Sequence, residues 1–321
     1  MAPSSILLEP TLAGPAHRVP TGRGEPVPTP FWIAAALLTF AVAIGLPLSG
    51  TVATLAATIL FVGGGLPHGA YDIALLAQTR MLDGRGMVLG LGGYILVAVS
   101  MVVLWLAAPV VALIAFLAAA AVHFGEDWTM LDEPLLKVAA GAAIIAAPAL
   151  AHPAAVTALF VAMSEDRAGV VIAQVMVAAA PVALLVTAVG VAVAWREGAR
   201  AWATATTVAL LALLIAPPVL GFALFFVFLH SPRHFASTRG TLRMMSRRRW
   251  LLTGASMSTA AIAGWLVLTR LVWSLPTPDL TAQAFQLLAA VAVPHLLMSR
   301  SITNLLARRS AAASLDYGTT E

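Results

Sequence analysis

The 321-residue sequence contains no cysteine, and only 10% of its residues are charged. The absence of cysteine excludes a disulfide framework, a thiolate metal site and a cysteine nucleophile. The shortage of charge excludes an ordinary soluble domain, in which about 25% of residues are charged, because too little polar surface remains to cover a globule in water. The sequence is instead 60% hydrophobic, with a mean hydropathy of +0.94. We therefore expect an all-α, polytopic transmembrane helical bundle.

The charged residues that are present lie mainly at the ends of apolar segments. The net charge of +4 is thus not gathered on an amphipathic face, and we expect no nucleic-acid partner. Residues 1–29 are rich in proline and glycine and poor in large apolar side chains, which predicts a disordered N-terminal tail. We expect one transmembrane catalytic domain over residues 30–303 and a C-terminal tail over residues 304–321.

About ten apolar segments follow one another closely within that domain. Each is roughly 20 residues long, which is the length a helix needs to cross a hydrocarbon core of about 30 Å. Every tryptophan except Trp265 falls at or near a segment end, where amphipathic rings prefer the headgroup level. The expected spans are 31–48, 53–79, 87–107, 109–124, 135–151, 168–195, 200–216, 218–235, 250–273 and 280–300.

Lysine and arginine residues orient these spans. With the N-terminus inside, all of the 18 except Arg167 and Arg270 fall on the cytoplasmic side, as the positive-inside rule requires. The rule therefore predicts that both termini are cytoplasmic. It also favours treating residues 152–167 as a re-entrant or interfacial piece rather than a further span. The Pro217-Pro218 pair is expected to separate two helices.

Histidines provide the candidate functional residues. Of the seven, His17 lies in the tail and His152 precedes a proline at an expected helix end, so we expect a function for neither. The other five come from four spans and can meet in the inner leaflet. His230 and His234 are four residues apart and so share one helix face. Ionisable side chains at this depth are costly to bury and are usually functional. The five are His68, His123, His230, His234 and His295.

Imidazole ligands without thiolates suit iron, copper, zinc or nickel. Four histidines on one ion leave two positions open in an octahedral sphere, where Fe(II) can bind O2 beside a substrate, but they would close a tetrahedral zinc site. Asp72 shares a helix face with His68 and could orient an imidazole or ligate the metal itself. The alternative is that the histidines, and the carboxylates Asp72, Glu126 and Asp127, serve only packing and interhelical hydrogen bonds.

The segments that carry these histidines resemble, in order and spacing, the motifs of the bacterial Brp/Blh family. This family comprises the integral-membrane beta-carotene 15,15′-dioxygenases that supply retinal to microbial rhodopsins. The resemblance covers about residues 55–300. The four motifs are GLPHGAYD at 65–72, HFGED at 123–127, HSPRH at 230–234 and PHLL at 294–297.

The resemblance implies an enzyme of the bacterial plasma membrane that uses O2 to cleave the central double bond of beta-carotene, or a related carotenoid, to retinal. It also implies an Fe(2+) cofactor, with His295 and Asp72 supporting the ligands or lining the pocket. Family members often carry a histidine directly after the motif aspartate, where this chain has Ile73, which bears on the carotenoid accepted. The implied ligands are His68, His123, His230 and His234.

A carotenoid is a rigid apolar rod about as long as a bilayer is thick, so it partitions into lipid. Its site is expected to be a mostly apolar tunnel, lined by residues such as Tyr71, Phe124 and Phe226. Two other functions fit part of the pattern, namely a bis-histidine haem protein and a small-solute transporter. A membrane di-iron hydroxylase would need more histidines, including adjacent pairs, which this chain does not have.

Overall fold

The computed structural model describes residues 27–78, 84–129, 131–271 and 279–317, with side chains over 27–77, 84–129, 131–269 and 279–301. Every regular element in these ranges is a helix, which confirms the all-α class. Most of the expected N-terminal tail, up to residue 26, lies outside the described residues, and the first helix begins at Thr29. The last helix runs on to Tyr317, through residues expected to form the C-terminal tail.

Fifteen helical elements follow one another in these described ranges. They are α1 (Thr29–Ala43), α2 (Thr51–Gly65), η1 (Leu66–Tyr71), α3 (Asp72–Gln78), α4 (Gly84–Ala107), α5 (Pro109–Gly125), α6 (Pro134–Ala151), α7 (Pro153–Ser164), α8 (Ala168–Arg196), α9 (Arg200–Ile215), α10 (Pro218–Ala223), η2 (Leu224–His230), α11 (Ser231–Thr241), α12 (Arg247–Leu271) and α13 (Leu280–Tyr317).

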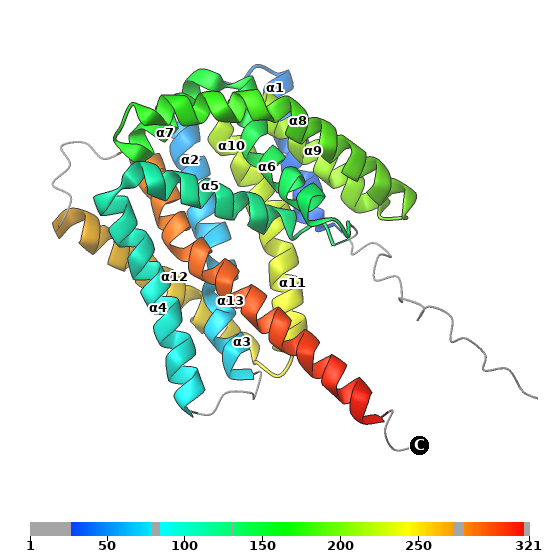
Figure 1. Ribbon diagram of the computed structural model, residues 1–321. Helices are drawn as coiled ribbons and strands as arrows, with labels where there is room; N and C mark the ends of the chain where they lie inside the picture. The colour runs from blue at the N-terminus through cyan, green and yellow to red at the C-terminus, as the bar shows by residue number, and fades with distance from the viewer. Residues whose placement is uncertain (1–26, 79–83, 130, 272–278, 318–321) are drawn as a thin grey trace, which may run out of the picture.

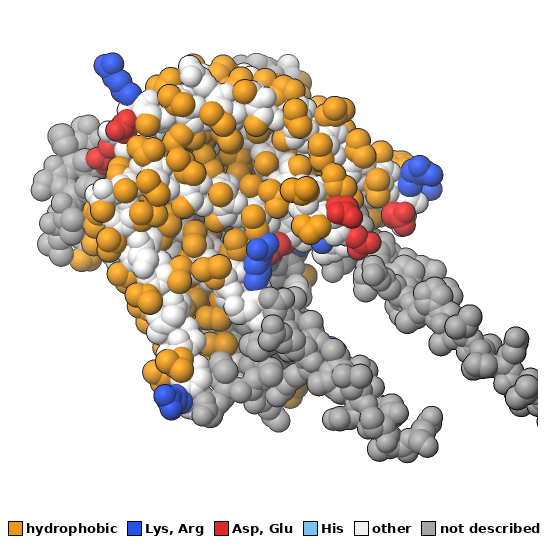
Figure 2. All heavy atoms as spheres, in the orientation of Figure 1, with side chains coloured by type: hydrophobic (Ala, Val, Ile, Leu, Met, Phe, Trp, Pro, Cys, Tyr) orange, Lys and Arg blue, Asp and Glu red, His pale blue; other side chains and the backbone are white. Residues whose placement is uncertain are grey.

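Seven continuous helical stretches in the described residues are long and apolar enough to cross a membrane. They are Thr51–Ala77, Gly84–Ala107, Pro134–Ala151, Ala168–Arg196, Pro218–Thr241, Arg247–Thr269 and Leu280–Ser301. Hydrophobic side chains cover the face of the molecule shown in Figure 2, and charged side chains gather mostly at its margins. The chain is therefore consistent with a multi-pass membrane protein, because such a surface is suited to lipid rather than to water.

The expected count of ten spans is not confirmed. The other three expected spans fall on α1, α5 and α9, which are apolar but shorter helices. A helix of 17 residues such as α5 is only about 26 Å long at 1.5 Å per residue. Residues 153–164, which were not assigned a span, form the short helix α7. The predicted break at Pro217-Pro218 is present, since α9 ends at Ile215 and α10 begins at Pro218.

The helices pack around α13. In Figure 1, α6, α8 and α9 lie side by side along one side of the molecule, and the three pack against one another. Helix α13 packs against α2, α4, α5, α7 and α12. As a result, 72% of the residues in the most apolar part of its Leu280–Ser301 stretch are buried. In the most apolar part of α4 only 6% of the residues are buried, and in that of α12 only 11% are buried. These two helices therefore lie at the periphery, where lipid would surround them.

Two helices depart from regular α-helical winding in the segments that carry His68 and His230. Helix α2 continues as a 3-10 segment, η1, which begins after three glycines and contains Pro67. Helix α10 continues as a π segment, η2. The end of α2 touches η2, because a Cβ atom at Gly65 would collide with the ring of Phe226. Glycine at position 65 thus allows η2 to approach the backbone of α2 directly.

Candidate metal centre

Five imidazoles meet where η1, α5, η2, α11 and α13 come together. His68 lies in η1, His123 in the last turn of α5, and His295 on α13 directly after Pro294. His230 is the last residue of η2, and His234 lies in the first turn of α11. Four of the five are buried, and the side chain of His234 is 23% exposed. The expected convergence of histidines from distant parts of the chain is therefore present.

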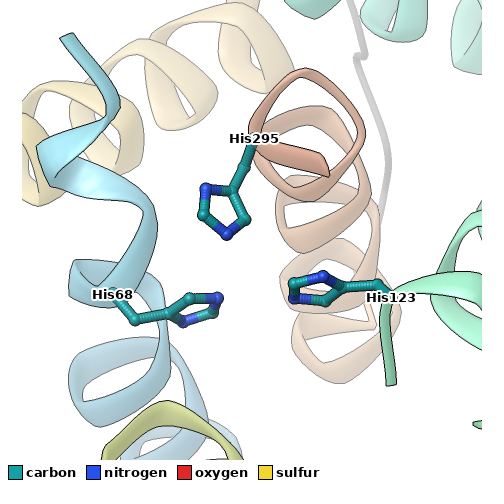
Figure 3. Close-up of side chains that lie close together, drawn as sticks. All are labelled: His68, His123 and His295. Carbon is teal, nitrogen blue, oxygen red and sulfur yellow. The ribbon is translucent and has the colours of Figure 1, made fainter. Parts of the chain in front are cut away.

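The rings are close enough for their nitrogens to face one space. Figure 3 shows His68, His123 and His295 pointing toward one another from three different helices. The ring centroids are 5.1 Å apart for His68 and His295, and 5.3 Å apart for His123 and His295. On the other side of the cluster, His230 and His234 are 4.5 Å apart, and His123 and His230 are 4.7 Å apart.

These side chains form two groups that could hold a metal ion, and His123 belongs to both. One group is His68, His123 and His295, and the other is His123, His230 and His234. Within each group the candidate ligand nitrogens all lie within 4.8 Å of one another. The buried histidines can therefore bind a metal, and His295, expected beside the ligands, contributes a nitrogen to the same space as His68.

The outer nitrogens of four imidazoles face oxygen atoms of the chain. Nδ1 of His230 lies 2.8 Å from Oδ2 of Asp127, and Nδ1 of His295 lies 2.8 Å and 2.9 Å from the two carboxylate oxygens of Asp72. Nδ1 of His68 faces the backbone carbonyl of Gly65. Nδ1 of His123 lies 3.4 Å from Oε2 of Glu126 but makes no hydrogen bond among the described residues. Such oxygen partners on the ring nitrogen that points away from a metal are typical of metal-binding histidines.

The inner nitrogens lack comparable partners. Nε2 of His295 is buried and accepts or donates no hydrogen bond among the described residues. Nε2 of His123 and Nε2 of His230 lie 3.0 Å apart. A neutral imidazole carries one proton, so a ring that donates from Nδ1 presents a bare lone pair at Nε2. For His230 and His295, whose Nδ1 atoms face carboxylates, the lone pair at Nε2 therefore points inward.

Two carboxylates support the cluster from opposite sides. Asp72, four residues after His68, contacts His295 on another helix rather than His68 itself, and it is also hydrogen-bonded to Tyr94. Asp127 follows α5, and its oxygens lie near both His230 and His234. Burial raises the pKa of the Asp127 carboxyl above its usual range, while the neighbouring His234 and Arg233 act in the opposite direction.

Tyr94 and Asp127 were not among the predicted site residues. Asp127 did carry a signal, since it belongs to the same short motif as His123. Tyr94 carried one as well, because it is a hydroxyl-bearing side chain inside an otherwise apolar span. His152 lies at the junction of α6 and α7, outside the histidine groups, and His17 lies outside the described residues.

With this geometry in place, similarity to known proteins becomes informative. The family model for beta-carotene 15,15′-dioxygenase matches residues 57–302, which is more than half of the chain. The chain belongs to the beta-carotene 15,15′-dioxygenase family. It is therefore a carotenoid dioxygenase. A protein named beta-carotene 15,15′-dioxygenase from the uncultured marine bacterium 66A03 is 26% identical over 259 residues, covering 75% of this chain and 90% of that relative. No solved structure matches the chain.

Two of the three aromatic residues expected at the site of this carotenoid dioxygenase lie against the histidines. The ring of Phe124 lies 5.1 Å from that of His230, and the ring of Phe226 lies 5.4 Å from that of His68. Tyr71 points elsewhere. Its ring stacks on Trp250 at 3.8 Å, and its hydroxyl donates a hydrogen bond to the backbone carbonyl of Trp250. Tyr71 therefore ties η1 to α12.

Proposed function

We propose that this dioxygenase uses a non-haem Fe(II) ion and O2 to cleave the central double bond of beta-carotene, or a related carotenoid, to retinal. The family and its named relative support a carotenoid as the substrate. Two open coordination positions beside the ligands would leave room for O2 next to the substrate. The proposed ligands are His68, His123, His230 and His234.

The observation that carries the metal is the pair of facing nitrogens on His123 and His230. Asp127 accepts the Nδ1 proton of His230, and Glu126 lies beside Nδ1 of His123. With its proton on Nδ1, His230 presents a bare lone pair at Nε2, 3.0 Å from Nε2 of His123, and a cation bound by both nitrogens would satisfy the two rings together. Two nitrogens about 2.1 Å from one ion and at a right angle are about 3.0 Å apart. This spacing supports an ion with open positions more than a closed tetrahedral one.

The reaction balances without any further reactant. The central carbon–carbon double bond is broken, and each of its two carbons gains one oxygen atom from the same O2 molecule. When bound, Fe(II) supplies the ability to activate O2 for this step. For the symmetrical beta-carotene the products are two identical retinal molecules.

The residues of the chain have two tasks in this proposal. Asp72 and Asp127 hold the imidazoles in one tautomer and orientation, so that their Nε2 atoms remain available to the metal. The rings of Phe124 and Phe226 cover the histidines with apolar surface, which excludes water and suits a hydrocarbon substrate. His295 offers a fifth nitrogen to the same space and is a further candidate ligand.

The two alternative functions find less support. A haem would need a flat space for its macrocycle between two imidazoles, but five imidazoles crowd the centre, and His234 and His295, on different helices, have ring centroids only 6.0 Å apart. A transporter of small solutes would not belong to a family of carotenoid dioxygenases. We also propose that the protein lies in the bacterial plasma membrane with both termini in the cytoplasm, as the distribution of basic residues predicts.

Expression in a carotene-accumulating bacterial host tests the proposed function. The wild-type chain should bleach the orange colour of the cells, and retinal should appear in their extracts. His230→Ala and His234→Ala should each abolish both changes, because each removes a proposed ligand, whereas His152→Ala should leave them unaffected. Bleaching that persists in both ligand variants would show that the assignment of the ligands is wrong.

A further inference from the structure

A cavity of about 530 Å³ lies between η1, α3, α4, α12 and α13, beside the histidine cluster. One stripe of α4 forms a wall of it, with Tyr94, Ala98, Val102 and Leu106 at intervals of four residues. Helix α12 contributes much of the remaining lining, and α13 contributes Leu287, Ala290 and Val291. The volume is within the range of about 300–1,000 Å³ that is usual for small-molecule sites.

The inner end of this cavity lies against the residues that support His295 on its Nδ1 side. Gly69 and Asp72 both line it. Asp72 accepts the hydrogen bond from Nδ1 of His295, and a Cβ atom at Gly69 would lie only 3.4 Å from Cγ of the same ring. Tyr94, also in the wall, is hydrogen-bonded to Asp72. A molecule at this end of the cavity would therefore lie directly against the residues that hold His295.

The length of the cavity matches half of a carotenoid. The α4 wall extends from Tyr94 to Leu106, a distance of about 18 Å at 1.5 Å per residue. A carotenoid is about as long as a bilayer core is thick, about 30 Å, so one half measures about 15 Å. The walls between the two ends are almost wholly apolar, as a hydrocarbon rod requires.

One side of the cavity opens toward the surface that lipid would cover. Val99 and Val103 line the cavity, and each is also 51% exposed. They lie on α4, which with α12 is among the least buried of the candidate spans. A substrate dissolved in the bilayer can therefore enter between α4 and α12 without crossing water.

Two smaller spaces lie nearer the histidines themselves. One of about 20 Å³ is lined by His68 and His123, and a neighbouring one of about 70 Å³ shares Phe116 and Phe124 with it. Both are much smaller than the cavity beside Asp72.

From the position, length and lining of the larger cavity, we infer that it binds one half of the carotenoid, with the polyene leading past Asp72 and Gly69 toward the histidine cluster and the ring toward Leu106. This inference rests on the proposed function. Ala98 on α4 and Ala261 on α12 lie in the walls, so their small side chains leave the space that the polyene occupies. Both residues are consequently specificity-determining residues.

Binding of all-trans-beta-carotene to the full-length chain in liposomes tests the inference, with quenching of tryptophan fluorescence as the readout. Ala98→Phe and Ala261→Phe fill the cavity from different helices, and each should raise the dissociation constant at least tenfold. The matched controls are Ser100→Phe on α4 and Ala263→Phe on α12, at exposed positions outside the lining, which should bind like the wild type. Unchanged melting temperatures would show that the cavity variants fold, as expected for side chains that enter a void.

The possible results distinguish a failure of the cavity assignment from a failure of the proposed reaction. If both cavity variants bind beta-carotene as tightly as the wild type, the inference is overturned even where the wild type produces retinal. If the wild type binds beta-carotene and the cavity variants do not, the inference holds even if no cleavage occurs, and only the proposed reaction fails. A wild-type chain that does not bind beta-carotene would overturn both.

Discussion

At the scale of the residue, the centre depends on which nitrogen of each imidazole faces inward. Three of the imidazoles have an oxygen partner at Nδ1: His230 faces Asp127, His295 faces Asp72, and His68 faces the carbonyl of Gly65. In each of these rings Nε2 is left for another partner. Fixing a tautomer in this way makes the imidazole a better ligand, because the ring does not have to reorient when a metal binds.

Asp72 offers the sharpest test at this scale. Asp72→Ala removes the acceptor that holds Nδ1 of His295 and should weaken metal affinity about 10–100-fold. Asp72→Asn keeps an oxygen acceptor at the same place and should lose much less. Competition with a chelator measures both affinities in the purified protein, and thermal melting of the metal-free variants controls for folding. Equal affinity in Asp72→Ala and the wild type would rule out a supporting role for this carboxylate.

The sequence could predict which histidines meet, but it could not predict what holds them. The spacing of His230 and His234 was sufficient to place both on one helix face, and their rings do lie 4.5 Å apart. Asp72 was expected to share a helix face with His68, yet its partner is His295, which is 223 residues away. Such a contact depends on how α13 packs against η1, and no local periodicity records that packing.

At the scale of the element, two irregular helical segments set the position of the ligands. The π segment η2 ends at His230, and the 3-10 segment η1 contains His68. Segments of this kind are frequent at functional sites, because they rotate side chains away from the regular α-helical positions. Phe226 of η2 packs on His68 of η1 and on Gly65, the residue just before η1.

A pair of glycine variants tests this contact. Gly65→Ala places a methyl group against the ring of Phe226, so it should push η2 away from α2, lower the melting temperature and reduce metal loading. Gly63→Ala lies in the same helix, and its methyl group meets nothing within 4 Å. It should leave metal loading unchanged and stabilise the helix by up to about 1 kcal/mol. The contact would have no role if both variants melted and bound metal alike.

The sequence predicted the apolar elements well and their irregularities poorly. The expected span 53–79 corresponds to the helical stretch Thr51–Ala77, and the expected break before Pro218 is present. The runs of apolar residues and the prolines carry this information. The change to a 3-10 or π winding leaves no comparable pattern, because it results from neighbouring helices. For the same reason Tyr71, expected in the pocket, instead packs on Trp250.

At the scale of the whole molecule, α13 is enclosed while α4 and α12 remain exposed. This arrangement places His295 in the interior and leaves the α4 and α12 walls of the cavity at the surface that lipid would cover. The apolar surface in Figure 2 fits a bilayer environment.

The orientation of the chain in that bilayer can be measured directly. A green fluorescent protein fused after Glu321 should fluoresce, because the distribution of basic residues predicts a cytoplasmic C-terminus. An alkaline phosphatase fused at the same point should be inactive, since that enzyme needs the periplasm to form its disulfides. The opposite pair of results would reverse the proposed topology and leave the histidine centre unaffected.

Iron analysis of the purified, full-length chain tests the central claim, that imidazoles from distant helices hold one iron ion. The wild type and His152→Ala, which alters a histidine outside the cluster, should each contain about one iron per chain. His123→Ala should contain less than a tenth of that amount, because His123 belongs to both histidine groups. A wild-type protein without iron, or a His123→Ala protein with its full complement, would contradict the account.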